Sequence, residues 1–174
     1  MAKISNEIIK EFFSIGKIVE GNFAKDLMAS EGGVVFPSSR NDDVVNHIDL
    51  YWTKNNKTCS FDVKGARKKR RSDTSVSYDA TWLELKNIAG QDGSLCGKED
   101  YIAFEMQTTW MIVRRKELLK NLLLKITDNT IYRVNPNEDF KLYQRKDRKD
   151  VIVRVPYIFI MDNTVKIISK TIDN

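Results

Sequence analysis

Hydrophobic residues in the first fifth of the chain recur at the spacing of amphipathic helices. Between residues 5 and 13 the apolar side chains lie three or four positions apart, which is typical of one buried helical face. Residues 17–29 carry a second stripe at i, i+4 spacing, made of Val19, Phe23 and Leu27. The glycine pair 32–33 follows and predicts the end of this second helix.

Short segments in which apolar and polar residues alternate come next, and they predict strands. The first three are residues 34–36, 47–52 and 58–64. The polar turn 54–57 joins the last two into a hairpin, and the polar stretch 65–80 predicts a loop. Farther along we expect strands at residues 81–86, 101–107 and 110–113, a helix over 115–125, and a final hairpin formed by 151–161 and 165–168.

The composition indicates a folded globular chain. Of 174 residues, 41% are hydrophobic, and only 3 Pro and 8 Gly are present, which argues against a disordered or linker-rich protein. This length can bury a core without disulfides or structural metal. Together with the mixed element order, it predicts a single α/β domain covering residues 1–174.

Other features exclude several classes of protein. Two cysteines, Cys59 and Cys96, are far apart, and His47 is the single histidine, so a zinc site of the Cys/His type is excluded. The first residues carry Glu7 and Glu11 and do not resemble a signal peptide. No apolar run approaches 18 residues, so no membrane partner is expected. We therefore expect a cytoplasmic protein.

Positive charge is concentrated in two segments. The chain has 29 basic and 24 acidic residues, a net charge of +5. Six basic residues and no acidic one lie between positions 64 and 71, namely Lys64, Arg67, Lys68, Lys69, Arg70 and Arg71. Six more lie between positions 141 and 154, diluted by Asp147 and Asp150. Clustered charge of this kind suits a polyphosphate such as a nucleic acid, because each neutralised phosphate releases counterions.

The strand pattern also brings acidic residues together. In the segment Ser60–Gly65, Asp62 and Lys64 share one face, because side chains alternate along a strand. In the preceding strand, Asp49 faces the same way as His47, opposite its apolar neighbours. If the hairpin pairs with its apolar faces together, the two aspartates lie close enough to share a divalent cation, which would offset their repulsion.

Lys64 completes this constellation. Its ammonium could orient an attacking water molecule or neutralise charge that develops on a phosphate. The alternative interpretation is a half-exposed strand, in which charged and apolar residues alternate for solubility alone. The aspartate on the preceding strand, the upstream helix bearing Glu20 and the downstream basic cluster favour the functional interpretation.

The pattern resembles a known family. Asp49, twelve residues (50–61) and then Asp62-Val63-Lys64 is similar to the signature of PD-(D/E)XK nucleases, in which a helix precedes a hairpin that bears the catalytic groups. The stretch GKIVEGNFAKDLMASEGGVVFPSS resembles the opening of archaeal-type Holliday junction resolvases. The likeness covers about residues 16–66. It departs from the family at Ile48, where proline often precedes the first aspartate.

This resemblance implies a restriction-endonuclease-like fold, with a mixed central sheet flanked by helices and a metal site at one sheet edge. It implies a Mg²⁺-dependent endonuclease that hydrolyses phosphodiester bonds of duplex or branched DNA, with Mn²⁺ as a substitute. Asp49 and Asp62 would bind the metal with the carbonyl of Val63, Glu20 would bind directly or through water, and Lys64 would position the nucleophile. A homodimer is a further option, since resolvases work as symmetric pairs.

Several other residues are candidates for contact with nucleic acid. The basic residues Arg67, Lys68, Lys69, Arg70 and Arg71 follow the proposed active strand and suit a phosphate clamp, although a solvated loop is the plainer interpretation. Ser38 matches a serine-bearing loop of resolvases loosely, and His47 shares the face of Asp49. Tyr78 and Trp82 could stack on unpaired bases or be buried.

Two alternatives stay open. A rival triad consists of Glu84 and Lys86 with Asp79 or Asp62 as the first carboxylate, in a segment that weakly resembles phage or restriction-type members of the superfamily. We rank this triad lower because Asp79 precedes Glu84 by only five positions. The chain could instead be a nucleic-acid-binding protein of the same fold without turnover, or a phage-type protein-interaction factor whose charges are merely surface.

Overall fold

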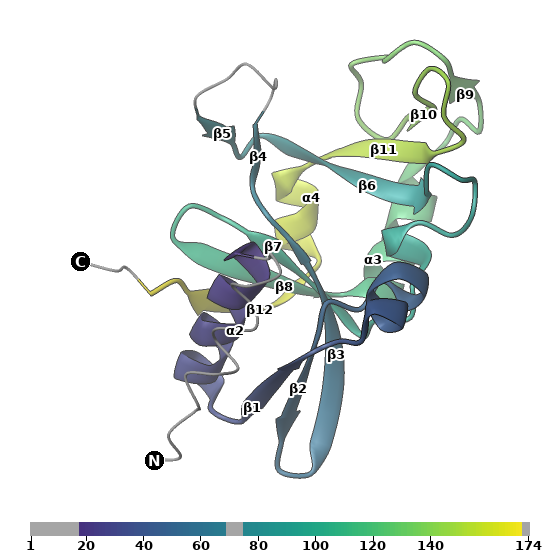
Figure 1. The fold of residues 1–174 in the computed structure, drawn as a ribbon. Helices are drawn as coiled ribbons and strands as arrows, with labels where there is room; N and C mark the ends of the chain where they lie inside the picture. Colours follow the sequence, from purple (N-terminus) through teal and green to yellow (C-terminus); the bar gives the residue numbers. More distant parts are fainter. Residues whose placement is uncertain (1–17, 69–74, 172–174) are drawn as a thin grey trace.

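The computed structural model describes residues 18–68 and 75–171 of the chain and contains a larger and a smaller β-sheet (Figure 1). The helix expected for residues 5–13 and the basic residues Lys69, Arg70 and Arg71 lie outside the described residues, and the side chains of Arg67 and Lys68 are not described. A mixed α/β architecture was expected from the order of the elements, and it is confirmed.

The larger sheet is mixed and has six strands. In spatial order these are β1 (Val34–Pro37), β2 (Leu50–Lys54), β3 (Lys57–Lys64), β7 (Tyr101–Glu105), β8 (Thr109–Arg114) and β12 (Thr164–Ser169). Every neighbouring pair is antiparallel except β3 and β7, which are parallel. The predicted β2–β3 hairpin is confirmed, with Leu50 opposite Phe61.

One face of this sheet is covered by the helix α2 (Ile18–Glu31) (Figure 1). The predicted apolar stripe explains the packing, because Phe23 and Leu27 join a buried cluster with strand residues such as Leu50 and Phe61. The rings of Phe23 and Phe61 lie 5.3 Å apart, and those of Phe23 and Trp110 lie 5.1 Å apart.

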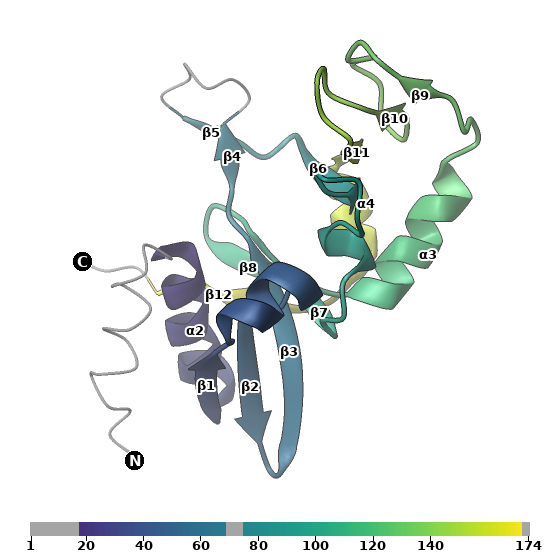
Figure 2. The ribbon, with the colours of Figure 1, turned by 45° about the vertical axis from the view of Figure 1, so that its right-hand side comes forward.

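The second sheet has four strands and contributes to a separate core. Its order is β6 (Ala80–Lys86), β11 (Val151–Pro156), β10 (Leu142–Tyr143) and β9 (Ile131–Tyr132). The helices α3 (Arg115–Lys125) and α4 (Tyr157–Asp162) supply further residues of this core (Figure 2). Leu83 and Val153 of the small sheet are buried there with Ile102 and Val113 of the large sheet. The second core therefore joins the small sheet to the face of the large sheet opposite α2.

The remaining elements are short. They are a π-helical turn η1 (Asp42–Asn46), the strand pair β4 (Arg67–Lys68) and β5 (Val76–Ser77), and a 3₁₀ turn η2 (Ser94–Cys96). The loop predicted over residues 65–80 thus contains two short strands. Within the described residues, no helix is both long and apolar enough to cross a membrane.

The final hairpin predicted from residues 151–161 and 165–168 is wrong. The first strand, β11, ends at Pro156, and the apolar residues that follow form α4. The strand β12 then pairs with β8 in the larger sheet, whereas β11 pairs with β6 and β10 in the smaller one. Proline explains the change, because it has no N–H for a strand ladder and is favourable at a helix start.

Candidate active site and adjoining pocket

The strand β3 separates its side chains as the sequence predicts. Phe61 and Val63 point into the core beneath α2. Asp62 is buried on the opposite face, next to Ile102, its neighbour on β7 and a member of the second core. The faces alternate because side chains of a strand point to opposite sides of the sheet. The candidate centre therefore lies on the side of the large sheet that faces the small one.

Asp49 lies immediately before β2, on the same side as Asp62. Its N–H donates to the carbonyl of Phe61 (2.8 Å) and its carbonyl accepts from the N–H of Ser38 (3.0 Å), so its backbone continues the sheet. One carboxylate oxygen, Oδ2, accepts a hydrogen bond of 2.7 Å from the N–H of Val63. This bond holds the Asp49 carboxylate against β3 at Val63, the residue between Asp62 and Lys64.

Lys64 is ion-paired with Asp62, at 2.7 Å between Nζ and Oδ2. The lysine side chain is 25% exposed and the aspartate side chain 5%, so the ammonium connects a buried carboxylate to the surface. Both strands of the centre, β2 and β3, are interior strands of the large sheet. The sequence had predicted a site at one edge of the sheet.

Burial and neighbouring negative charge act together on the centre. Burial, and after it the charges of Asp62 and Glu20, together raise the pKa of Asp49 to about 8, while the Val63 N–H and Lys64 oppose the change. Glu20 lies in the first turn of α2. Its neighbour Val19 packs near Gly65, just beyond β3. The helix thus brings Glu20 within electrostatic range of Asp49, in agreement with the predicted grouping.

A fourth carboxylate, Glu99, was not predicted from the sequence. It is 1% exposed, and within the described residues neither of its carboxylate oxygens accepts a hydrogen bond. Nε of Arg115 lies 3.8 Å from its Oε1. Burial, together with the charge of Asp62, raises the pKa of Glu99 to about 8. The parallel pairing of β3 with β7 brings Glu99 near Asp62, and this pairing left no signal in the sequence.

The donor set fits a hard divalent cation in part. Carboxylate oxygens suit Mg²⁺, which takes one or two protein carboxylates and completes its shell with phosphate and water. Asp49 and Asp62 supply two such carboxylates, and a bound cation would relieve their mutual repulsion. However, among the residues that the structure describes, no three His, Cys, Asp or Glu side chains are grouped closely enough to form a metal site by themselves.

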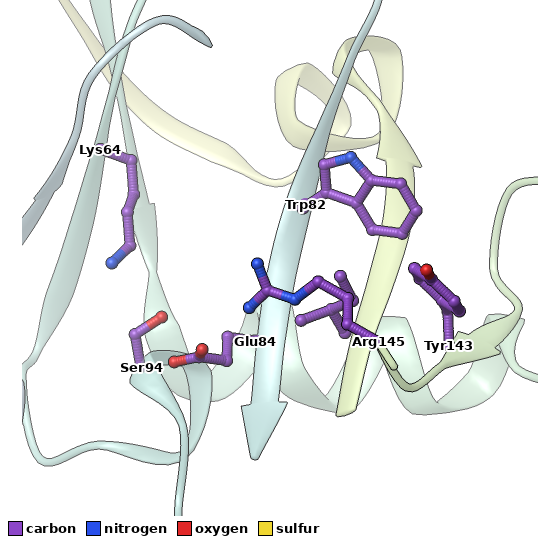
Figure 3. Close-up of a pocket in the computed structure, with 7 residues that line it drawn as sticks. Lys64, Trp82, Glu84, Ser94, Tyr143 and Arg145 are labelled. Carbon is purple, nitrogen blue, oxygen red and sulfur yellow. The ribbon is translucent and has the colours of Figure 1, made fainter. Parts of the chain in front are cut away.

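A pocket opens beside Lys64, between the two sheets (Figure 3). Its volume is about 280 Å³, and it is lined by Lys64, Trp82, Glu84, Ser94, Tyr143, Arg145 and Ile152. Three segments distant in the sequence supply these side chains, and nothing in the sequence predicted Ser94, Tyr143 or Ile152 among them. The pocket adjoins the carboxylate centre through Lys64, which belongs to both.

The other predicted site residues lie around this centre. Ser38 contacts Asp49 through its backbone N–H. His47 was predicted to begin a strand over residues 47–52, but the observed strand β2 begins at Leu50. His47 has a left-handed backbone (φ 57°), and its Nε2 lies 3.1 Å from the carbonyl oxygen of Asp92. Its ring therefore contacts the loop before η2.

The rival triad is not assembled as a unit. Glu84 lines the pocket with Lys64. Lys86 is exposed at the end of β6, where its backbone forms an isolated antiparallel β-bridge with Asp92. Asp79 is exposed, and its carboxylate accepts a hydrogen bond from the hydroxyl of Ser77 (3.1 Å). Of these residues, Glu84 is the one that shares the pocket beside Lys64.

No family model, curated protein or solved structure matches this chain.

Proposed function

We propose that this protein is a divalent-metal-dependent nuclease of the PD-(D/E)XK type, with a restriction-endonuclease-like fold, that hydrolyses phosphodiester bonds of DNA. One observation carries the proposal: Asp49, Asp62 and Lys64 share one face of a hairpin, with the Asp49 carboxylate bound to the Val63 N–H and Lys64 paired to Asp62. The order of a helix followed by this hairpin supports the same assignment.

The residues have separate roles in this proposal. Asp49 and Asp62 would hold Mg²⁺ or Mn²⁺, together with the carbonyl of Val63 and with Glu20 directly or through water. When bound, the cation would neutralise charge on a phosphodiester and lower the pKa of a water molecule. Lys64 would place its ammonium beside the scissile phosphate, where it orients the nucleophile and offsets developing negative charge.

Burial strengthens these roles. Asp62 is almost fully enclosed and Lys64 is three-quarters buried, so their charges interact in a medium of lower dielectric constant than water. The hydrogen bond from Val63 holds the Asp49 carboxylate in place before substrate binds. A preorganised charged centre of this kind needs little rearrangement in the transition state.

The test is cleavage of branched, linear and single-stranded DNA in Mg²⁺ or Mn²⁺. Asp62→Ala and Lys64→Ala should lower the cleavage rate by about 100-fold or more, since a few kcal/mol of transition-state stabilisation are lost. Asp162→Asn, at an exposed carboxylate ending α4, should leave the rate unchanged. Cutting by Asp62→Ala at the wild-type rate would end this assignment.

A nucleic-acid-binding protein without turnover is the second candidate. The observation that favours it is the lack of three grouped metal-ligating side chains among the described residues. EDTA separates the two functions, because DNA binding persists in both cases while only the nuclease loses an activity. If no DNA in the panel is cut by the wild-type protein in either metal, the binding function is the better assignment.

A further inference from the structure

The strand β6 presents two kinds of side chain to the two sides of the small sheet. Leu83 points into the second core, so its neighbours Trp82 and Glu84 point the other way. Ile152 on β11 is opposite Glu84, and Tyr143 on β10 is opposite Ile152. The face of the small sheet away from its core therefore carries an aromatic and charged surface, and this surface forms one wall of the pocket.

Two aromatic rings form one end of this wall. The rings of Trp82 and Tyr143 lie 6.0 Å apart at an angle of 50° (Figure 3). Both residues are only half-buried, so ring surface is left open toward the pocket. Open aromatic faces on a sheet are the feature on which proteins stack the bases of single-stranded nucleic acids.

Cationic groups form the other end. Arg145 is held by Asp150, which is fully buried: the guanidinium pairs with its carboxylate, and the Arg145 N–H donates to Oδ1 at 3.3 Å. Figure 3 shows the guanidinium of Arg145 directed across the pocket toward the side from which Lys64 extends. Two fixed cations on opposite walls suit a phosphate, and a guanidinium is well shaped to bind one.

Glu84 and Ser94 lie between the two cations (Figure 3). Glu84 brings one negative charge to a lining whose two cations, Lys64 and Arg145, each have an aspartate partner outside the lining, Asp62 and Asp150. A carboxylate accepts hydrogen bonds from exocyclic amino groups such as that of cytosine. The lining therefore offers an aromatic surface, a phosphate-binding pair and a hydrogen-bond acceptor within one cavity.

We propose that this pocket binds one unpaired nucleotide of the nucleic acid, with its base against Trp82 and Tyr143 and its phosphate between Lys64 and Arg145. The proposal rests on the proposed nuclease function, because it names single-stranded or unpaired DNA as the substrate delivered to the centre at Lys64. A volume of about 280 Å³ is at the small end of ligand pockets. A base in a duplex must leave its stack to enter a pocket.

Oligonucleotide binding tests this assignment without cleavage. The probes are a 5′-phosphorylated oligo-dC of four nucleotides and a blunt DNA duplex, each titrated in EDTA against the full chain carrying Asp62→Asn. The single strand should bind more tightly and quench the fluorescence of Trp82. Trp82→Leu or Arg145→Gln, added to this chain, should weaken single-strand binding about tenfold, the loss expected for one stacked base or one phosphate contact.

Trp52→Phe is the matched control. Trp52 is also half-buried, but it lies on β2 and its Nε1 donates to the carbonyl of Gly32 (2.8 Å); its replacement should keep both the affinity and the Trp82 quenching. Arg145→Gln removes the ion-pair partner of the buried Asp150 and could prevent folding. In that case Tyr143→Leu replaces it as the second pocket variant, with the same expected loss of single-strand affinity. Equal or tighter binding of the duplex, or unchanged single-strand affinity in the pocket variants, would overturn the pocket.

This experiment separates the pocket from the nuclease. Pocket-dependent binding of the single strand with no cleavage by the wild-type protein would remove the proposed function and leave a nucleotide site. Asp62-dependent cleavage with normal affinity in Trp82→Leu would remove the pocket and leave the nuclease.

Discussion

Glu99 illustrates how strongly the protein interior acts on a single residue. Its side chain is enclosed beside Asp62 and Arg115, and burial raises its pKa to about 8. A carboxyl group with that pKa is mostly protonated at pH 7, whereas in the unfolded chain it would be ionised near its ordinary pKa of 4.5. Folding therefore takes up a proton at this position over the intervening pH range.

The first prediction follows from this proton uptake. Since the folded state binds the proton more tightly, the free energy of unfolding should fall as pH rises from about 4.5 to about 8. Each pKa unit corresponds to about 1.4 kcal/mol, so the loss should be roughly 5 kcal/mol over the whole range and roughly 3 kcal/mol between pH 5.5 and pH 8.5. Glu99→Gln cannot ionise and should lack this part of the pH dependence. Urea unfolding in EDTA at pH 5.5 and 8.5 measures this difference in the free energy of unfolding for both proteins.

The control for this prediction is Glu117→Gln. Glu117 is an exposed carboxylate in the first turn of α3, so its replacement should leave the wild-type difference between the two pH values in place. The same difference in wild type and Glu99→Gln would contradict a protonated, buried Glu99.

Alternation along one strand is why part of the site could be predicted. The i, i+2 spacing of Asp62 and Lys64 and the short turn before β3 were enough to bring Asp49 to the same side. Glu99 could not be found in this way, because parallel pairing of β3 with β7 joins segments about forty residues apart. His47 was placed on a strand, but its left-handed backbone ends η1 instead.

At the level of elements, α2 is tied to the large sheet by one buried aspartate. Asp26 is 4% exposed. Its Oδ2 accepts a hydrogen bond from Nε1 of Trp110 on β8 (2.8 Å), and its Oδ1 accepts one from the N–H of Thr171 after β12 (2.8 Å). One side chain therefore joins the helix to two later segments of the chain.

The second prediction concerns this link. Asp26→Ala removes both acceptors and leaves buried donors without partners, so it should lower the free energy of unfolding by about 2–5 kcal/mol. Asp26→Asn keeps one acceptor and should cost less. Because neither change touches the centre at Lys64, any cleavage rate per folded molecule should be unchanged. Urea unfolding followed by Trp fluorescence measures the stability.

Ser30→Ala provides the comparison on the same helix. Ser30 is exposed and bonds only locally, to Glu31 (2.9 Å), so its loss should change stability by less than about 0.5 kcal/mol. If Asp26→Ala lowered the free energy of unfolding by no more than Ser30→Ala does, the aspartate would not hold α2 to the sheet.

The elements themselves were predictable where periodicity was strong and failed where it was ambiguous. The helix α3 begins and ends at the predicted residues 115 and 125, and β6 differs by one residue. The run 151–161 is apolar except for Arg154, and periodicity alone cannot separate a strand from a buried helix in such a run. Pro156 was the available signal, since it marks the start of α4.

At the scale of the whole molecule, the two sheets bring both basic segments to one pocket. Lys64 comes from the segment 64–71 and Arg145 from the segment 141–154, and both line the same cavity. The sequence could count these charges but not place them, because the pairing of β6 with β11 joins residues about seventy positions apart. The exposed residues Lys146 and Arg148 lie just after Arg145, with Asp147 between them.

The last prediction uses these exposed cations. If a nucleic-acid strand enters the pocket at Arg145, Lys146 and Arg148 should neutralise its neighbouring phosphates, which then release their counterions to the solvent. Each such contact on a single strand contributes roughly 0.7 to the slope of log K against log salt. Replacing both residues by glutamine should therefore reduce the slope by roughly 1.4 and weaken binding to every sequence alike. Titrating oligo-dC at several NaCl concentrations measures the slope.

Lys57→Gln is the control, compared per charge removed, because it removes one positive charge and the double variant removes two. Lys57 begins β3 at the hairpin turn, whereas Lys64 ends the same strand and lines the pocket. A slope that falls equally for the Lys57 variant would indicate that only the net charge of +5 matters. A slope that falls for the Lys146 and Arg148 variant alone means that the strand follows the surface beyond Arg145, because screened charges far from the phosphates contribute little.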